Sequence, residues 1–469
     1  MDSKGEPLVG VQGAKPLGLA CLLTVLALSA LWPRAKVQAF DVFDQPFYLG
    51  IAYDLVHAGR FTNGYFFQEP PVDAARPPGM RFTPVYPALL AGASAVDGRF
   101  AAAMDCLVAS RGGDASCSRS ASLVRWAQFG MLACFYVLVW GMARRITGCE
   151  RGGWVGLGLA LLTAPELLNY VNYMMTEITA LTLATGALAA GVRGIAERRG
   201  RFFVLAGGLA GCAALTRPAY FYLFLVCAAA GFVLALIGPG RSARFRRVAG
   251  FAAAGVVVVV PWLLRNFVVL GDASLTAGYG PQVLVQRVAF DLMSWTEFFR
   301  SLVCWLPDGN GLGGMLFGPG SCHRFQWADQ ADNFYAIGNG PLMAESLAAA
   351  GGWPHMFSYL LHEFILAEPV KYAAVTVSLA LRGAWVSNYW GLVLAPVCAI
   401  MTWRAAARLD WLFLAIALPA WFMLIFAAAV SVNQTRYNLM LIPAFAVAGA
   451  MAVEAVLARR RLRESYPGG

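Results

Sequence analysis

The chain has 469 residues, of which 59% are hydrophobic and only 13% are charged, whereas soluble domains carry about 25% charged residues. Its formal net charge is +10, but the basic residues fall in short runs between apolar stretches and form no aromatic-flanked basic patch. Composition and charge therefore exclude a soluble globular protein and a nucleic-acid binder, and they favour an all-α polytopic membrane protein.

Ten apolar stretches are long enough to cross a bilayer as helices. We predict membrane spans near residues 17–33, 121–143, 153–170, 174–192, 202–216, 219–238, 249–268, 385–403, 411–430 and 438–457. The first has the length of a signal peptide, but it lacks a small-x-small cleavage site, so we expect it to be retained as a helix. Together the stretches predict a single helical bundle.

Short basic runs lie between these stretches, at residues 144–145, 198–199, 241–247, 404–408 and 459–463. Because short loops rich in Lys and Arg stay in the cytoplasm, these runs orient the protein with both termini inside. Two long connections, about 34–120 and 269–384, then lie outside. The Ala- and Arg-rich composition suggests a bacterium, so we expect a multi-pass protein of the bacterial cytoplasmic (inner) membrane with an external active site.

This arrangement divides the chain into an N-terminal transmembrane module (1–268) that includes the first external connection, an external region (269–384), and C-terminal transmembrane helices (385–469). Each external connection contains one predicted surface helix. The first helix covers residues 44–58, with Asp44 as its N-cap and with an apolar face at i, i+3, i+4 and i+7 formed by Tyr48, Ile51, Ala52 and Leu55. The second, residues 356–367, is expected to lie along the membrane surface.

Four cysteines lie in the external connections: Cys106, Cys117, Cys304 and Cys322. One disulfide within each connection, Cys106 with Cys117 and Cys304 with Cys322, is one interpretation. Four free thiols are the other, because connectivity does not follow from sequence.

An arginine–proline pair, Arg217-Pro218, interrupts the apolar stretch over residues 202–238. As one helix this stretch would be about 55 Å long at about 1.5 Å per residue, against a hydrocarbon core of about 30 Å. We therefore predict two spans joined by an external turn at Arg217. Two further arginines, Arg265 and Arg436, are expected at the outer ends of spans.

External cations at helix ends are disfavoured by the positive-inside rule, so three of them together suggest an anionic ligand. A guanidinium offers a planar fork of donors that suits phosphate. For each arginine alone, the alternative is contact with lipid headgroups or pairing with a carboxylate. Because the three share one side and one depth, we predict a shared phosphate site.

Two carboxylates are predicted on the same side. Asp44 follows the first span, and Glu177 begins the fourth. A carboxylate beside a bound phosphate is a candidate general base. Helix capping by Asp44 and a helix-dipole contact of Glu177 are the structural alternatives.

The remaining external polar residues indicate no further chemistry. No HExxH or other metal-ligand spacing accompanies the four histidines, so we predict no cofactor, a divalent metal being the alternative. We expect five other external acidic residues to be ordinary solvated charges: Asp54, Glu69, Asp308, Asp329 and Glu363.

Six short motifs follow one another in the chain. They are DQPFYLGIA from Asp44, RPPGMRFTPVYPALLAG from Arg76, MMTE ending at Glu177, LTRP, PWLLRN followed by GYG, and RYNLMLIP. In this order they resemble the GT-C membrane glycosyltransferases that use polyprenyl-phosphate sugars, such as protein O-mannosyltransferases and the lipid A aminoarabinose transferase. The resemblance covers residues from about 41 to 443. The family's first-loop pattern has Glu after the Asp, where this chain has Gln45.

The resemblance implies a GT-C transmembrane helical bundle with external juxtamembrane helices and an inverting glycosyl transfer. A sugar would move from a polyprenyl-phosphate donor to a glycolipid, polysaccharide or protein acceptor, with Asp44 as the base and Glu177 as the second acidic residue. Donor phosphate contacts are assigned to Arg217, Arg265 and Arg76, with Arg436 added from topology. Further candidate substrate-binding residues in the motifs are Tyr48, Arg81, Tyr86 and Asn266.

Two other functions stay open. A lipid or sugar transporter or flippase would be expected to carry ionisable residues near the middle of the membrane and often inverted repeats, and we see no convincing repeat. A catalytically inert scaffold that retains the fold is compatible with Gln45. The sequence identifies neither the sugar nor the acceptor.

Overall fold

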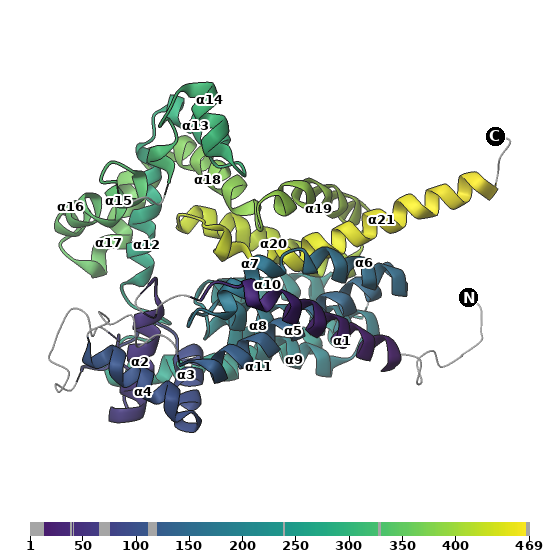
Figure 1. Cartoon of the computed structure of the whole chain (residues 1–469), viewed down its shortest axis with the longest axis horizontal. Coiled ribbons are helices and arrows are strands. Elements are labelled where there is room, and N and C mark those ends of the chain that lie inside the picture. Colours follow the sequence, from purple (N-terminus) through teal and green to yellow (C-terminus); the bar gives the residue numbers. More distant parts are fainter. Residues whose placement is uncertain are drawn as a thin grey trace.

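The structure is a computed structural model, and it describes residues 14–37, 40, 42–64, 76–110, 120–237, 240–326 and 330–465. Every regular element in these residues is a helix, which confirms the predicted all-α fold. The helices form one elongated bundle with two lobes at the same end (Figure 1).

Eight helices in the described ranges are long and apolar enough to cross a membrane, which makes the chain a multi-pass membrane protein. They are α1 (Ala14–Leu31), α5 (Ser122–Thr147), α8 (Glu177–Glu197), α10 (Ala219–Leu236), α11 (Arg241–Leu270), α19 (Tyr389–Arg408), α20 (Trp411–Val430) and α21 (Leu441–Ser465). They correspond to eight of the ten predicted spans.

The other two predicted spans differ from straight, full-length helices. Residues 153–170 form a bent pair, α6 (Glu150–Leu161) and α7 (Ala164–Val171), at an angle of 61°. Pro165 in the first turn of α7 has no backbone N–H and so marks the start of a new helix. Residues 202–216 correspond to α9 (Gly200–Ala214), which is about 22 Å long at about 1.5 Å per residue.

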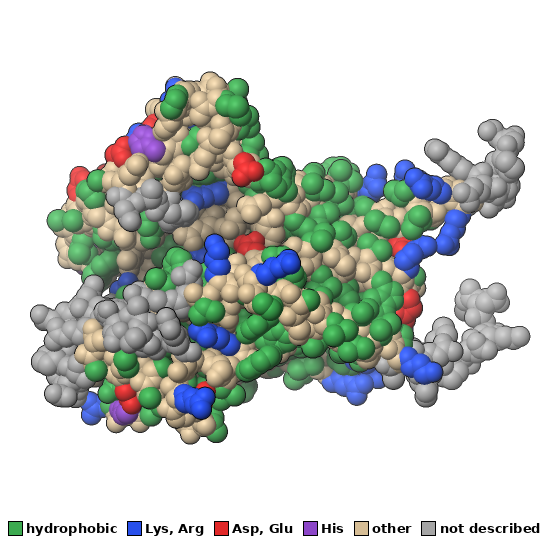
Figure 2. Space-filling model, viewed as in Figure 1, with side chains coloured by type: hydrophobic (Ala, Val, Ile, Leu, Met, Phe, Trp, Pro, Cys, Tyr) green, Lys and Arg blue, Asp and Glu red, His purple; other side chains and the backbone are tan. Residues whose placement is uncertain are grey.

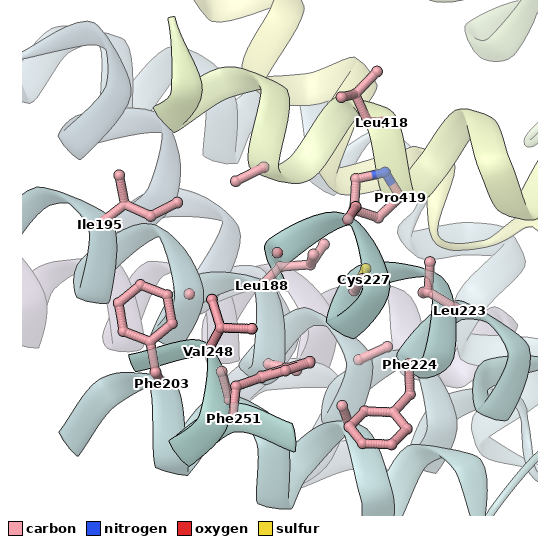
Figure 3. A pocket seen from close by; sticks show the side chains of 18 of the residues that line it. Leu188, Ile195, Phe203, Leu223, Phe224, Cys227, Val248, Phe251, Leu418 and Pro419 are labelled. Carbon is pink, nitrogen blue, oxygen red and sulfur yellow. The ribbon is translucent and has the colours of Figure 1, made fainter. Parts of the chain in front are cut away.

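Glycines allow α9 to pack closely against α11. A Cβ added at Gly207 would lie 1.9 Å from the carbonyl oxygen of Phe251, and one at Gly211 would lie 3.0 Å from that of Gly255. Small residues let helix backbones approach one another in membranes. Beside this contact, α8, α9, α10, α11 and α20 surround an apolar groove of about 290 Å³, shown in Figure 3.

Ion pairs join helix ends at the end of the bundle where α1 begins and α21 ends. Arg145 Nη2 lies 3.3 Å from Glu197 Oε1, which joins α5 to α8. Arg151 of α6 pairs with Glu454 of α21. Figure 2 shows Lys and Arg side chains gathered at this end. The basic runs used to orient the spans therefore lie at the end opposite to the two lobes.

The first lobe is formed by the connection that follows α1. It contains α2 (Gln45–Ala58), α3 (Val85–Val96) and α4 (Gly98–Ala109). The helix predicted at residues 44–58 is confirmed as α2, and Ile51 and Ala52 of its predicted apolar face are fully buried. The helices α3 and α4 were not predicted.

The second lobe is formed by the connection between α11 and α19. Its helices are α12 (Tyr279–Val288), η3 (Ala289–Leu292), α13 (Trp295–Cys304), α14 (Gly309–Phe317), η4 (His323–Phe325), α15 (Phe334–Asn339), α16 (Pro341–Ala350), α17 (Trp353–Leu360), the π-helical η5 (Leu361–Ile365) and α18 (Pro369–Ala384). The helix predicted at residues 356–367 corresponds to α17 with η5. The Cys304–Cys322 disulfide is present, whereas Cys117 lies outside the described residues and its pairing with Cys106 stays a prediction.

A buried arginine anchors the second lobe to the bundle. Arg287 of α12 is fully buried, and its Nη1 lies 2.9 Å from Asp291 Oδ1. Its Nε donates to the Ala428 carbonyl of α20 at 2.8 Å, and its Nη2 donates to Thr376 Oγ1 of α18 at 2.9 Å. One guanidinium therefore joins α12 to α18 within the lobe and to α20 of the bundle, both more than 80 residues away in the chain.

We expect Arg287→Met to destabilise the protein by about 3–5 kcal/mol, because the Asp291 carboxylate would stay buried without its cation. Reversible unfolding in mixed micelles measures this change. Arg404→Met, at an exposed position of α19, is the control and should have little effect. An unfolding free energy that is equal in both variants would contradict the anchoring role.

Candidate active site

Asp44 lies at the point where the first lobe joins the bundle. It is the N-cap of α2, as predicted, but its side chain makes no capping hydrogen bond. Phe43, the residue before it, has a positive φ of 58°, a conformation that is costly for a bulky residue. The Asp44 carboxylate is therefore not used by the helix that positions it.

Gln45 fixes the start of α2 against the segment that leads to Glu177. Its side chain is fully buried, its Oε1 accepts a hydrogen bond from the Met174 backbone N–H at 2.8 Å, and its Nε2 donates to the Val42 carbonyl at 3.1 Å. A carboxylate here would place an oxygen without a proton against that carbonyl. The amide therefore suits the position where the family resemblance led us to expect Glu.

Glu177 is the centre of a charged cluster. It is the first residue of α8 and only 2% exposed. Its Oε1 lies 3.5 Å from Arg217 Nη1 and 3.9 Å from Arg436 Nη1. Arg436 Nη2 lies 4.0 Å from Asp44 Oδ2. The structure thus brings four of the predicted site residues together, from four separate segments of the chain.

Two turns supply the arginines. Arg217 lies between α9 and α10, where its backbone N–H donates to the Ala213 carbonyl at 2.8 Å and Pro218 is the N-cap of α10. This is the turn that the length of the apolar stretch predicted. Arg436 lies in the short 3-10 helix η6 (Thr435–Asn438) between α20 and α21. The ring of Tyr437 is 4.9 Å from the Arg217 guanidinium and 5.3 Å from that of Arg436, so it holds both cations.

The cluster keeps both arginines charged. Burial opposes the charge of Arg217, but the Glu177 carboxylate and neighbouring phenols raise its pKa above the ordinary value. For Arg436, burial is likewise outweighed by Tyr437, Glu177 and Asp44, which hold its pKa well above the usual range. Burial and the Asp44 and Glu177 carboxylates also raise the pKa of Tyr48, so its phenol stays protonated.

No hydrogen bond of ordinary length joins the carboxylates of the cluster to its guanidinium groups. The charge pairs are 3.5–4.0 Å apart, which is longer than a normal N–H···O hydrogen bond of about 2.7–3.2 Å. Within the part of the chain that the structure describes, Glu177 Oε2 and Arg436 Nε are buried without a hydrogen-bond partner. Buried polar atoms are usually satisfied, so each of these two atoms can still form a hydrogen bond with a group outside the protein.

A cavity of about 930 Å³ opens at Asp44 and Arg436. One side is formed by α7 and the segment after it, and the other by the second lobe and the turn before α19. Its charged lining residues are Asp44, Glu166, Asp308, Arg382 and Arg436. Its aromatic lining residues are Phe43, Tyr170, Tyr173, Trp305, Phe325, Tyr335 and Trp385. Figure 2 shows acidic and basic side chains near the hollow between the α13–α14 lobe and the bundle.

Arg265 and Asn266 are not brought to this cavity. Arg265 donates to the carbonyls of Gly79 at 2.7 Å and Phe61 at 2.9 Å, and Asn266 donates to the Ser274 carbonyl at 2.9 Å. Both side chains hold the first lobe and the loop after α11 in place. The geometry gives them a structural role, and phosphate contact by Arg265 stays a prediction.

Arg76 is paired away from the cluster. Its Nη1 lies 3.1 Å from Asp54 Oδ2, both residues are buried, and Thr62 donates to the same carboxylate. The expectation that Asp54 is a solvated charge was therefore wrong, because its partners come from distant parts of the connection and no local spacing marks them. Burial outweighs these partners and raises the pKa of Asp54.

The remaining predicted residues surround the cluster at greater distance. Arg81 Nη2 donates to Gln282 Oε1 at 2.5 Å, which joins the two lobes. Tyr86 is buried, and its hydroxyl donates to Gln128 Oε1 at 3.4 Å. Tyr48 packs edge-on against the Tyr86 ring, with centroids 5.5 Å apart. Burial and the Glu177 carboxylate raise the pKa of both phenols, and Asp44 also raises that of Tyr48.

Of the four other acidic residues that we expected to be solvated charges, two lie in the described part of the chain. Asp308 is exposed, but it lines the cavity and accepts a hydrogen bond from the Tyr389 hydroxyl. Glu363 is exposed, as expected. Glu69 and Asp329 lie outside the described residues. The described residues contain no group of three or more His, Cys, Asp or Glu side chains that could hold a metal ion.

Sequence reasoning missed Glu166, Arg382, Trp385 and Tyr437. The first three line the cavity, and Tyr437 packs against two arginines of the cluster. Only Tyr437 lies within a motif that the sequence analysis used. The others come from a bent helix and from the end of α18, where no spacing marks them.

Fold and cluster together define a polytopic helical membrane protein with a cluster of two arginines and two carboxylates at one end of its bundle. No family model and no curated protein matches the chain. Solved structures do. The chain is similar to the archaeal oligosaccharyltransferase AglB from Archaeoglobus fulgidus, solved with an inhibitory peptide and a dolichol-phosphate (TM-score 0.47, 12% identity, 97% of this chain and 52% of that chain).

It is also similar to ArnT from Cupriavidus metallidurans bound to undecaprenyl phosphate (TM-score 0.38, 15% identity, 94% of this chain and 78% of that chain). The chain spans about half the length of the oligosaccharyltransferase. Both solved proteins are of the kind that the sequence motifs resemble.

We expect Gln45→Glu to destabilise the protein by about 1–3 kcal/mol at pH 8, because a buried carboxylate oxygen would face the Val42 carbonyl. Reversible unfolding in mixed micelles measures the difference. Gln330→Glu, at an exposed position of the second lobe, is the matched control and should be neutral. If Gln45→Glu is as stable as the control, then the amide has no structural reason to be there.

Proposed function

We propose that this protein is an inverting glycosyltransferase that moves a sugar from a polyprenyl-phosphate donor to an acceptor. We place the reaction at the external (periplasmic) face of a bacterial cytoplasmic membrane. One observation carries the proposal: Arg217 and Arg436 lie 3.5 and 3.9 Å from one buried Glu177 oxygen, with Asp44 beside Arg436.

The arginines would hold the departing phosphate. A phosphate that leaves with its charge neutralised by fixed cations needs no proton. The two guanidinium groups are kept charged, and neither is within hydrogen-bonding distance of its carboxylate partner. Their N–H groups are therefore available to phosphate oxygens. Glu177, behind them, would fix their positions and balance their charge.

Asp44 would activate the acceptor. It lines the cavity, its side chain is 36% exposed, and it makes no capping hydrogen bond. In the proposed step the acceptor oxygen or nitrogen forms a bond to the anomeric carbon as the bond from that carbon to the phosphate oxygen breaks. The acceptor proton goes to Asp44, and the electron pair goes to the phosphate. A single displacement of this kind inverts the anomeric configuration.

The apolar groove offers a place for the polyprenyl chain. Its lining includes Ala213 and Tyr220, which flank the Arg217 turn, and Met440, which follows η6. The rest of its lining is apolar, as Figure 3 shows for Leu188, Phe203 and Phe224. A lipid whose phosphate lies between Arg217 and Arg436 would thus find an apolar path along the bundle.

The external location of the cluster is inferred from the positions of the basic loops. The basic loops lie at the opposite end of the bundle from the cluster. If those loops are cytoplasmic, the cluster is external. The charged groups lie at one end and not at the middle of the bundle, where a transporter would be expected to carry them.

We expect Asp44→Asn to lower sugar transfer by roughly 10²–10⁴-fold, because the acceptor would lose its base. Cell-envelope glycans are compared by mass spectrometry in a deletion strain that carries the wild-type gene, Asp44→Asn or the control Asp105→Asn, an exposed carboxylate of α4. Wild type and control should restore the missing glycan, and immunoblots should show equal protein. Full restoration by Asp44→Asn would reject the proposal.

A further inference from the structure

One side of the cavity is built independently of the Asp44 cluster. We call it the outer wall and define it as Trp305, Asp308, Asn310, Trp385 and Asn388. These residues come from the end of α13, the α13–α14 turn, the start of α14 and the α18–α19 turn. They follow Asp44 in the chain by more than 250 residues. None of them was assigned a role by the motifs.

Covalent and packing contacts hold the outer wall rigid. The Cys304–Cys322 disulfide joins the end of α13 to η4. The Trp305 indole N–H donates to the Phe325 carbonyl at 3.3 Å, and the Arg382 guanidinium lies 5.2 Å from its ring. A Cβ added at Gly313 would lie 2.3 Å from Cys322 Sγ, so α14 packs directly on the disulfide.

Backbone strain is concentrated at the cavity. Phe43, Asp308 and Asn388 line it with positive φ angles of 58°, 55° and 57°. Ser387 and Asn433, which also have positive φ, are each next to a lining residue. The two other non-glycine residues of this kind in the described chain end helices α8 and α19.

Such conformations cost about 1–3 kcal/mol each and persist where the surroundings enforce them, often at binding sites. The Tyr389 hydroxyl donates to the Asp308 carboxylate and so connects two of the strained turns. Two of the five positions around the cavity, Asp308 and Asn388, belong to the outer wall. The outer wall is therefore preorganised.

The chemistry of the outer wall suits a carbohydrate. Two tryptophans, two amides and one carboxylate line the cavity here, so apolar ring surface lies beside hydrogen-bond donors and acceptors. Sugars present the same combination of C–H faces and hydroxyl groups. Including the neighbouring lining residue Arg382, this side has one carboxylate and one guanidinium, so it has no excess of cations for a phosphorylated ligand.

A peptide ligand fits this wall less well. Extended peptides are often bound by hydrogen bonds to an exposed strand edge. The regular elements that the structure describes around the cavity are all helices, so the described part of this wall offers no strand edge to a peptide.

We propose that the outer wall is the acceptor subsite and that it takes a neutral carbohydrate. The role of the wall as an acceptor subsite rests on the proposed function, whereas carbohydrate binding at the wall does not. The cavity of about 930 Å³ is near the upper end of the range of about 300–1,000 Å³ for ligand pockets. It has room for the donor sugar at Asp44 and for more than one acceptor sugar at the wall.

Saturation-transfer NMR on the full-length protein in nanodiscs tests the subsite. The probes are the neutral trisaccharides maltotriose, mannotriose and arabinotriose, compared with a glucosamine disaccharide bisphosphate and a serine-rich peptide. We expect at least one neutral trisaccharide to bind wild type, and Trp385→Ala to weaken its binding by 10-fold or more. Trp295→Ala, an exposed tryptophan of α13 outside the cavity lining, is the control and should bind as wild type does.

A second variant covers the case in which Trp385→Ala does not fold. Asn388→Gly removes the amide but keeps a residue that adopts positive φ readily, and it should also weaken binding. The inference would be overturned if wild type bound none of the neutral sugars, if both cavity variants bound the trisaccharide as tightly as wild type, or if only the bisphosphate or the peptide bound.

The Asp44→Asn variant separates the two proposals. We expect it to bind the trisaccharide as wild type does, while it does not transfer sugar. Normal transfer by Asp44→Asn together with sugar binding would remove the proposed function and leave the carbohydrate site. Loss of transfer in Asp44→Asn without any trisaccharide binding to wild type would remove the subsite and leave the proposed function.

Discussion

The buried Glu177 carboxylate is the interaction on which the active end of this protein depends. A carboxylate at the start of α8 that is 2% exposed must be balanced by cations, and it takes them from two turns far apart in the chain, at Arg217 and Arg436. Removing a partner from a buried charge pair is strongly destabilising. The requirement for neutrality therefore determines where the α9–α10 turn and η6 lie relative to α8. It also places two guanidinium groups side by side, an arrangement that is repulsive unless an anion lies close.

The two lobes are attached to this end by polar side chains that are themselves buried. Gln45 connects the first lobe to the segment before Glu177, and Arg287 connects the second lobe to α20. Because each attachment is a directional hydrogen bond in a buried place, the lobes have defined positions at the cluster. The cavity between them follows from these positions. Its inner side carries Asp44 and Arg436 of the charged cluster, and its outer side carries aromatic and amide groups.

Much of the fold followed from the sequence, because hydropathy, helix length and basic loops report directly on a membrane bundle. The length of residues 202–238 required a turn at Arg217, and the turn is there. The helices of the second lobe were mostly missed, since they are short, interrupted by glycines and mixed in polarity. For the site, the sequence predicted that Asp44, Glu177, Arg217 and Arg436 lie on one side of the membrane at similar depth. The structure brings these four residues into one cluster. The same reasoning also included Arg265, which bonds to loop carbonyls instead. The depth of a residue along a helix does not indicate which neighbour its side chain faces. The burial of Asp54 depends on partners that no sequence spacing reveals.

The central claim is that the two arginines bind the phosphate of a polyprenyl lipid, and a competition experiment tests it most directly. Purified protein is equilibrated with undecaprenyl phosphate and undecaprenol, and the bound lipid is measured by native mass spectrometry. The account predicts that the phosphate is preferred, and that Arg217→Ala lowers this preference by roughly 10–100-fold, as expected for losing about 1.5–3 kcal/mol of a charged hydrogen bond. Arg300→Ala, in the second lobe, should retain the preference. Equal binding of the phosphate and the alcohol by the wild-type protein would contradict the account.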